Sequence, residues 1–238
     1  MRPLGFPRLH LREVDSTNVR AQRLAVSGAP HGTLVTAAGQ TAGHGRQGRA
    51  WVTPAGRALA CSLVLREPPR LLPMVAALAV ADVADHLDAA GRSAAIKWPN
   101  DVLLDGRKVA GILAEGRPQE GWVVLGIGLN VAVEEDAFPA DLREIATSLG
   151  CDPPQVEAAL ALLLTRLAHW LAATPKQAID AYRARDALAG REISWNGGRG
   201  TALGVDDDGR LRVRPTDRPS EEVLLDAGEV HIGSDAQR

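Results

Sequence analysis

The spacing of apolar positions divides the chain into segments of helical and of strand periodicity. Residues 19–25 are apolar at helical spacing; Asp15 or Ser16 precedes them as a candidate N-cap, and Gly28 and Pro30 end the pattern. Further helices are expected where long apolar runs lie between prolines and glycines. They cover 68–90, the run from Asp152–Pro153 to near Leu171, and the run from Thr174–Pro175 to near Gly190.

Short runs rich in β-branched residues predict strands between these helices. Asp105–Gly106 separates two of the runs, and this dipeptide is typical of a tight hairpin turn. Strands that are mixed with helices in this way predict an α/β domain. The predicted strands are 32–38, 57–65, 93–97, 102–104, 108–113 and 122–125.

The pattern changes after Gly190, where only short strands follow, separated by Asn196–Gly197–Gly198 and by Asp208–Gly209. Several short strands at close spacing predict a small β-barrel or sandwich. We therefore expect a larger domain over 1–189 and a smaller one over 190–238. The predicted strands of the smaller domain are 191–195, 201–205, 211–214 and 222–225.

Composition limits the classes of protein that remain. The 238 residues are 45% hydrophobic and 24% charged, as in ordinary globular proteins, and the formal net charge of −2 gives no long-range attraction to nucleic acid. The longest apolar stretch, 71–81, contains Pro73 and falls short of the ~20 residues that span a bilayer. No signal peptide is visible at the N-terminus. We expect a cytoplasmic protein that does not contact a membrane.

The only two cysteines, Cys61 and Cys151, are isolated from one another in the sequence. Such spacing suits a reducing compartment better than a disulfide scaffold. Because Cys61 lies within the apolar run 58–65, we expect a buried thiol there and not a nucleophile.

A glycine-rich segment, 43–48, matches the G-x-G-x-x-G pattern of dinucleotide-binding folds. That pattern binds pyrophosphate only where it opens a helix, and Val52–Thr53–Pro54 shortly after it disfavours a helix. Glycines still let a backbone approach a ligand closely, and Arg46 and Arg49 supply planar forks for carboxylate or phosphate. The segment therefore predicts a basic loop that closes over an anionic ligand, and a solvated surface loop is the alternative.

Lys97 is the second candidate for chemistry. Side chains alternate along a strand, so if Ile96 and Trp98 face the core, Lys97 projects to the opposite face near the end of the sheet. A lysine held there can neutralise charge that develops as a carboxylate attacks an α-phosphate. An exposed strand lysine without such a role is the alternative.

Gly126 and Gly128 lie in the segment 126–130, which ends the strand that begins at Trp122. Two glycines in a strand indicate either the close approach of a ligand or a bulge. The amide of Asn130 is a candidate for contact with an adenine edge.

Taken together, four segments resemble the biotin–protein ligase family, and the resemblance covers nearly the whole chain. They are DSTN (15–18), QTAGHGRQGRAW (40–51), KWPNDVLLDGRKVAGILAE (97–115) and GIGLN (126–130), in the family's order and spacing. The resemblance implies an α/β (α+β) catalytic domain with a mixed sheet similar to class II aminoacyl-tRNA synthetases, followed by a small SH3-like β-barrel. It also implies that ATP activates biotin as biotinyl-AMP before transfer to a lysine.

The resemblance implies roles for individual residues, with Lys97 and Arg46 as the catalytic groups. It makes ATP and biotin the substrates, with Mg²⁺ accompanying ATP on ligands that remain unknown. The acceptor would be a biotin carboxyl carrier domain of a carboxylase. The biotin-binding residues would be Ser16, Thr17, Asn18, Gln40, Gly43, His44, Gly45, Arg46 and Lys97, and the nucleotide-binding residues Arg49, Trp51, Asn100, Lys108, Gly128 and Asn130.

Two features distinguish this chain within the family. His44 stands where the family commonly has an arginine, and a neutral imidazole donates one hydrogen bond but forms no fork. The biotin motif begins at Asp15, which leaves no room before it for the helix-turn-helix domain of members that repress transcription. We expect a ligase without a DNA partner, monomeric or homodimeric.

Three alternatives remain. A lipoate–protein ligase shares the fold, but its R-R-x-x-G-G-G stretch is missing from this sequence. A non-catalytic binder of biotin or its adenylate would not need Lys97, Arg46 and Arg49. Nucleic-acid binding through the basic stretch 210–214 is disfavoured by the acidic residues 206–208 beside it.

Overall fold

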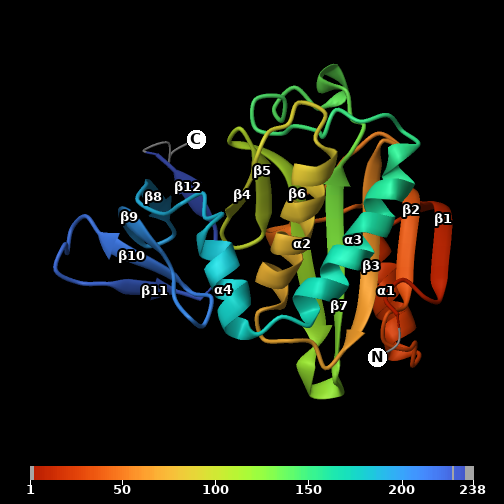
Figure 1. The fold of residues 1–238 in the computed structure, drawn as a ribbon, viewed down its shortest axis with the longest axis horizontal. Coiled ribbons are helices and arrows are strands. Elements are labelled where there is room, and N and C mark those ends of the chain that lie inside the picture. The colour runs from red at the N-terminus through yellow and green to blue at the C-terminus, as the bar shows by residue number, and fades with distance from the viewer. Residues whose placement is uncertain (1–2, 227, 234–238) are drawn as a thin grey trace.

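The computed structural model describes residues 3–226 and 228–233. Its larger sheet has seven strands in the order β1-β2-β3-β7-β6-β5-β4 (Figure 1). β1 runs parallel to β2, and every other neighbouring pair is antiparallel, so the sheet is mixed as predicted. These strands are β1 (Arg8–Val14), β2 (Leu34–Gln40), β3 (Ala58–Arg66), β4 (Ala94–Lys97), β5 (Asp101–Leu104), β6 (Arg107–Arg117) and β7 (Trp122–Asn130).

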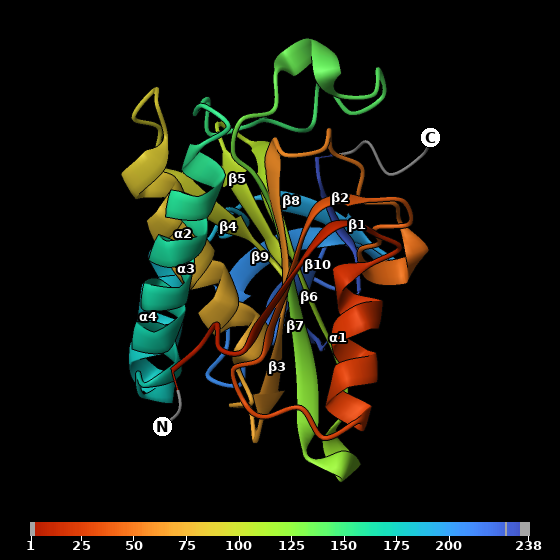
Figure 2. The ribbon, with the colours of Figure 1, turned by 90° about the vertical axis from the view of Figure 1, so that its right-hand side faces the viewer.

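Helices cover both faces of this sheet, as Figure 2 shows from the side. α1 (Thr17–Val26) packs on one face against β2, β3 and β7, while α2 (Leu72–Leu87) and α3 (Gln155–Leu171) lie on the other. Because both faces are covered, β3 is a nearly continuous apolar strand with eight consecutive buried residues. α2 lies between the sheet and α3, so it is apolar nearly all round.

The start of α1 places the hydroxyl groups of Ser16 and Thr17 beside the main cavity. Ser16, one of the two candidates that the sequence offers, is the N-cap residue, but its side chain makes no capping hydrogen bond. Instead Asp15 Oδ1 accepts a hydrogen bond of 2.8 Å from the backbone N–H of Ser16. The hydroxyl of Ser16 is therefore not used by the helix.

The second sheet is antiparallel and five-stranded, in the order β11-β10-β9-β8-β12. It is open, because the edge strands β11 and β12 do not pair within the described residues, so the expected small β-barrel is not confirmed. β12 lies beyond the last predicted strand and was missed. The strands are β8 (Glu192–Trp195), β9 (Gly198–Val205), β10 (Leu211–Pro215), β11 (Val223–Leu225) and β12 (Val230–Ile232).

The two sheets share one hydrophobic cluster, to which Leu78 and Ile96 contribute from the larger part and Val205 and Leu211 from the smaller. α4 (Pro175–Arg183) contacts β9 at this junction. The second sheet begins where the sequence changes character at 190. The division into domains over 1–189 and 190–238 stays a prediction, and the end of the second range lies outside the described residues.

Several helix ends differ from the sequence prediction, and α2 is shorter than the predicted 68–90. α3 begins at Gln155 and not at Pro153, and its N-cap position is Pro154. α4 is capped by Thr174 with a capping box, as Thr174–Pro175 predicts, but it ends at Arg183 and not near Gly190. The following residues form backbone hydrogen bonds with Ile96 in β4, so they leave the helix to pair with an edge strand.

Within the described residues, every helix is too short or too polar to cross a lipid bilayer.

Candidate active site

A cavity of about 600 Å³ lies where α1, β2, β4 to β7 and the glycine loop meet. Segments 138–146 and 228–232 complete its wall. It brings together residues that are far apart in the sequence. Of the residues predicted for the site, those lining it are Ser16, Thr17, Asn18, Gln40, His44, Gly45, Arg46, Arg49, Trp51, Lys97, Asn100, Lys108, Gly128 and Asn130.

Gly43 is the one predicted residue that does not line the cavity, and it lies immediately behind the wall. A Cβ at this position would come within 2.6 Å of the carbonyl oxygen of Trp51 and 2.8 Å of Nε2 of Gln40. The backbone N–H of Trp51 also donates to the carbonyl of Gly43 at 2.8 Å. The glycine therefore lets the two arms of the loop approach one another.

One end of the cavity is a connected set of uncharged polar groups. Gln40 Oε1 accepts hydrogen bonds from the backbone N–H of Thr17 at 2.8 Å and from its hydroxyl at 3.1 Å. Ser62, buried in β3, lies 2.9 Å from the hydroxyl of Thr17 and 2.6 Å from Oδ1 of Asn18. Such a set of fixed donors and acceptors suits a polar, uncharged ring.

Glu115 extends this polar end. Its Oε2 accepts from Nδ2 of Asn18 at 2.9 Å and from Nε2 of Gln22 at 3.1 Å. Nε2 of His44 lies 3.6 Å from the same oxygen. Glu115 thus links α1 to the glycine loop, and it fixes Asn18 so that the amide oxygen faces Ser62.

Gly126 in β7 makes room for Asn18. A Cβ at position 126 would come within 2.1 Å of Oδ1 of Asn18, so any larger residue would push that side chain away. The sequence predicted a ligand or a bulge at this glycine, whereas the group that approaches it in the structure is a protein side chain and the strand register is regular.

Lys97 ends β4 and projects into the cavity. Ile96 is fully buried and Trp98 is 3% exposed, and both belong to the hydrophobic core, as the sequence predicts, whereas Lys97 does not. Burial lowers the pKa of Lys97 below its ordinary value. The carboxylates of Asp101 and Glu229 oppose this shift in pKa. Lys97 is thus a half-buried ammonium whose neighbours include both signs of charge.

The glycine loop contributes two guanidinium groups, Arg46 and Arg49. It forms a narrow hairpin in which the N–H of Gly45 donates to the carbonyl of Arg49 at 2.7 Å. Its tip is a single 3-10 turn, Arg46–Gly48, with Gln47 at a φ of 57°. No α-helix begins here, so the dinucleotide-fold reading of the glycines is excluded. Burial lowers the pKa of Arg46, which indicates a guanidinium partly withdrawn from water.

Trp51 lies on a platform of two glycines at the other end of the cavity. Gly111 and Gly128 are opposite one another in the β6–β7 pair. A Cβ at Gly128 would come within 2.4 Å of the indole, and one at Gly111 within 3.4 Å. Nζ of Lys108 lies 5.8 Å from the centre of the ring and 2.7 Å from Oδ1 of Asp101. An aromatic face flanked by a cation suits a purine carrying phosphate.

The two predicted asparagines already use their amide nitrogens within the protein. Nδ2 of Asn100 donates to the carbonyl of Ile112 at 2.8 Å, and Nδ2 of Asn130 donates to that of Thr147 at 2.9 Å. Oδ1 of Asn130 is buried without a hydrogen-bond partner among the described residues. The amide oxygen of Asn130 is therefore an acceptor that the protein itself leaves unused among the described residues.

Sequence reasoning missed several residues of this site: Ser62, Asp101, Glu115, Glu229 and His231. Ser62 lies in an apolar strand, where no local pattern marks it. Asp101 and Glu115 lie within the segment 97–115 that resembles the family. Their place in that segment is the signal that could have identified them as site residues. Glu229 forms an ion pair with Arg49, and this contact joins the second sheet to the glycine loop.

No three His, Cys, Asp or Glu side chains gather as a metal site in the part of the chain that the structure describes. Cys61 is 1% exposed, and burial raises the pKa of its thiol to about 12. This agrees with the expected inert thiol.

Comparison with known proteins gives the chain its relatives. Residues 11–131 match the model of the biotin/lipoate A/B protein ligase family. The biotin--[acetyl-CoA-carboxylase] ligase of Paracoccus denitrificans is 38% identical, with 94% of this chain and 99% of that protein covered. The bifunctional ligase/repressor BirA of Bacillus subtilis is 43% identical, but the match covers 57% of this chain and 44% of that protein. The chain therefore spans less than half of that relative.

Solved structures agree with this assignment. The biotin protein ligase from Aquifex aeolicus in complex with biotin and ATP superposes with a TM-score of 0.78 at 26% identity, covering 95% of this chain and 98% of that one. The biotin--[acetyl-CoA-carboxylase] ligase of Mycobacterium tuberculosis is 35% identical over 92% of this chain and 86% of its own length. By sequence, by fold and by the residues around the cavity, the chain belongs to the biotin/lipoate A/B protein ligase family.

Proposed function

We propose that the chain is a biotin–protein ligase that makes biotinyl-AMP from biotin and ATP and then transfers the biotinyl group to a lysine. The relatives that match along most of their length are named as biotin ligases, which favours biotin over lipoate. One observation carries the proposal. The ammonium of Lys97 lies in one cavity with an uncharged polar end and a tryptophan–glycine platform.

In the first step an oxygen of biotin's carboxylate attacks the α-phosphorus of ATP, and pyrophosphate leaves. No protein nucleophile is needed, so the residues act by positioning and by stabilising charge. Lys97 bridges the carboxylate and the α-phosphate, and Arg46 provides a second cation from the loop. Their partial burial supports this role, because a cation removed from water acts more strongly on nearby charge.

Biotin's ureido ring occupies the polar end. The hydroxyl groups of Ser16 and Thr17 and the amide of Gln40 are its proposed partners, with Asn18 in the same set. Gly43, His44 and Gly45 form the strand of the loop that covers this end. The buried network around Ser62 supports the assignment, because it holds these side chains in fixed directions.

The nucleotide occupies the platform end, with its base near Trp51 and Gly128 and its phosphates near Arg49 and Lys108. Asn100 and Asn130 shape this wall, and the free oxygen of Asn130 is available to a base amino group. Mg²⁺ would enter with the phosphates of ATP. A substrate-borne ion agrees with a cavity whose lining carboxylates, Asp101 and Glu229, already pair with Lys108 and Arg49.

In the second step a lysine of a biotin carboxyl carrier domain attacks the acyl carbon and AMP leaves.

The proposal includes a cytoplasmic location, which is supported by two free cysteines. It includes no DNA partner, because Arg210 and Arg212 of the second sheet pair with Asp206 and Glu222. We retain the SH3-like description of that sheet, supported by its five short antiparallel strands. The proposed protein is a monomer or a homodimer.

A substrate comparison tests the proposal. The protein is mixed with Mg·ATP and either biotin or lipoate, and pyrophosphate release and the acyl-adenylate are measured, the latter by mass spectrometry. We expect biotinyl-AMP, followed by biotinylation of a carrier domain. Formation of lipoyl-AMP alone would identify a lipoate ligase, and binding of biotin without any adenylate would identify a non-catalytic binder.

A further inference from the structure

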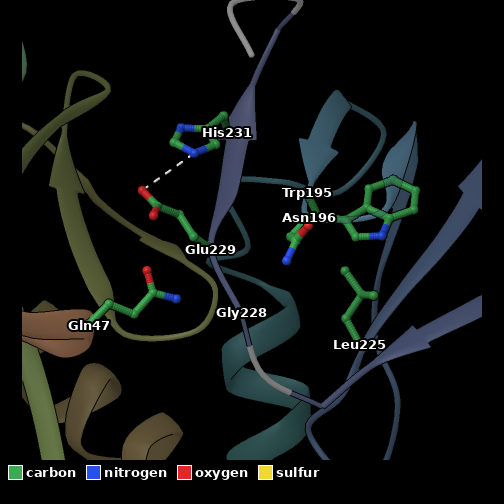
Figure 3. Close-up of a pocket in the computed structure, with 7 residues that line it drawn as sticks. All are labelled: Gln47, Trp195, Asn196, Leu225, Gly228, Glu229 and His231. Carbon is green, nitrogen blue, oxygen red and sulfur yellow. Dashed lines mark ion pairs between the residues drawn. The ribbon is translucent and has the colours of Figure 1, made fainter. Parts of the chain in front are cut away.

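A second cavity, of about 440 Å³, adjoins the first at the second sheet. Four residues line both cavities: Gln47, Gly228, Glu229 and His231. Figure 3 shows Glu229 and His231 pointing to the side of Gln47, with Trp195 and Leu225 on the other side of Gly228. A Cβ at Gly228 would meet no atom within 4 Å, so the space beside the backbone is open at this point of the shared wall.

Glu229 is the charged residue at the boundary of the two cavities. It immediately precedes β12, whose pairing with β8 holds the segment to the second sheet. Its carboxylate pairs with Arg49, and one oxygen lies 3.4 Å from Nε2 of His231. The negative charge of Glu229 also acts on Lys97 and Arg46. It favours their charged forms and so opposes the lowering of each pKa by burial. The carboxylate therefore lies among the cations proposed to bind the adenylate.

We propose that Glu229 binds the ammonium group of the acceptor lysine and accepts its proton in the transfer step, and that the second cavity admits this lysine side chain. The inference rests on the proposed ligase function and adds a residue and an entry route to it.

The chemistry of the second cavity fits a lysine. Trp195 and Leu225 offer apolar contact for the four methylene groups of the stem, and an indole face attracts a cation. The side-chain oxygens of Asn196 and Gln47 can accept hydrogen bonds from an ammonium. Glu229 supplies the matching negative charge next to the reaction cavity.

The ion pair with Arg49 gives the two steps an order. The guanidinium of Arg49 neutralises Glu229 in the structure. When biotinyl-AMP has formed, its phosphate competes for the same guanidinium, because arginine forks bind phosphate well. Release of Glu229 then leaves an unpaired carboxylate facing the second cavity. The acceptor lysine thus finds its counter-ion only after the adenylate is present.

The transfer step removes two protons from the acceptor ammonium. The acceptor ammonium gives one proton to the carboxylate of Glu229, and the resulting amine attacks the acyl carbon of biotinyl-AMP. The C–N bond forms, the bond from that carbon to the phosphate oxygen breaks, and AMP leaves with the electron pair. Glu229 passes its proton to His231, whose side chain is 50% exposed, and so to solvent. Glu229 then takes the second N–H proton as the amide forms.

The groups that face Glu229 favour this proton transfer. Arg49, Arg46 and Lys97 are cations on the loop and on β4, and they disfavour a further positive charge on the incoming amine. His231 on β12 is the only titratable neighbour that can carry the proton outward among the residues described for this cavity. In a variant without the Glu229 carboxylate, the rate of biotin transfer should therefore recover as pH rises, because hydroxide then accepts the proton of the acceptor lysine.

The experiment separates the two half-reactions in the variant Glu229→Gln. Biotinyl-AMP is formed from biotin and Mg·ATP and measured by mass spectrometry, and a biotin carrier domain is then added for a single turnover. We expect the variant to form biotinyl-AMP but to transfer biotin about 10²-fold more slowly at neutral pH, as for loss of a general base. Glu222→Gln is the matched control, because Glu222 pairs with Arg212 elsewhere on the same sheet. It should transfer at the wild-type rate.

Hydroxylamine provides the second readout. It is uncharged near neutral pH, so it attacks enzyme-bound biotinyl-AMP without first losing a proton, and wild type and Glu229→Gln should form the hydroxamate equally fast. Equal lysine transfer in both proteins would overturn the role of Glu229. Equal slowing of hydroxylamine and lysine transfer would overturn it too, since that result indicates a misplaced adenylate. A wild type that forms no biotinyl-AMP would instead contradict the proposed function.

Discussion

The indole of Trp51 lies against Gly128 so closely that a Cβ at position 128 would come within 2.4 Å of the ring. The glycine is needed because the loop carrying Trp51 folds back onto β7. The contact joins the glycine loop, which the sequence predicts to close over a ligand, to the fixed strand β7. It explains why a glycine interrupts an otherwise apolar strand.

Replacement of Gly128 by alanine should displace the indole and weaken ATP binding. We expect the KM for ATP to rise by about tenfold, which corresponds to roughly 1.4 kcal/mol of lost contact. Steady-state pyrophosphate release measures it. In a Trp51→Ala background the same replacement should have little further effect. Gly39→Ala is the control, because a Cβ there makes an ordinary contact of 3.5 Å with Ala55.

Removal of the Lys97 ammonium should slow adenylate formation strongly. Lys97→Ala is expected to lower the rate by about 10²–10³, the usual effect of losing one transition-state donor. The surface lysine Lys176, which pairs with Asp180 on α4, supplies a control variant with unchanged rate. A wild-type rate of pyrophosphate release in Lys97→Ala would exclude the proposed role.

The rate of adenylate formation should also fall as pH rises. The fall should begin at a lower pH than it would if Lys97 had the ordinary pKa of a lysine. Burial lowers the pKa of Lys97, so the ammonium is lost as pH rises through this lowered value. The carboxylate of Asp101 raises that pKa, so Asp101→Asn should move the alkaline limb of the pH–rate profile to still lower pH. The two profiles, measured in parallel, give the shift. An unmoved limb in Asp101→Asn would show that another group titrates there.

An arginine at position 44 should hold biotin longer. Nε2 of His44 lies 3.6 Å from Glu115, and a guanidinium there can form the paired hydrogen bonds that an imidazole cannot. We expect His44→Arg to slow biotin dissociation by about threefold to tenfold, or roughly 1 kcal/mol. Stopped-flow displacement measures it. His44→Ala should have the opposite effect, and faster release from the arginine variant would contradict the prediction.

The ion pair of Asp88 and Arg92 should make stability depend on acid pH. Burial by itself raises the pKa of Asp88, but hydrogen bonds and charge from Arg92 outweigh it, so the net pKa is lowered. The pair then stabilises the fold fully above the ordinary aspartate pKa, and this contribution is lost as pH falls through the lowered value. Asp88→Asn should cost about 1–3 kcal/mol in urea unfolding at neutral pH. The difference from wild type should shrink in strong acid.

Local patterns were sufficient for some parts of the site. Alternation along 96–98 predicted the direction of Lys97, and Val52–Thr53–Pro54 correctly excluded a helix after the glycines. Asp105 and Gly106 both have positive φ, as the predicted hairpin requires. Each of these conclusions depends on residues that are neighbours in the sequence.

Contacts between distant segments could not be predicted in the same way. Ser62 meets Asn18 across 44 positions, and Glu115 meets it across 97. Such pairs depend on strand order and register, which no local period encodes. The early end of α4 has the same origin, because the residues after Arg183 pair with β4.

The indole N–H of Trp98, next in sequence to Lys97, donates to the carbonyl of Gly209 at 3.0 Å. Gly209 occupies a tight turn at a φ of 81°, and a Cβ there would come within 2.6 Å of the sulfur of Met74. A lengthened or shortened turn at 206–209 would therefore disturb the support behind the ammonium of Lys97. No residue of this turn lines the cavity, so a change in its length should lower activity without altering any group that would touch the substrates.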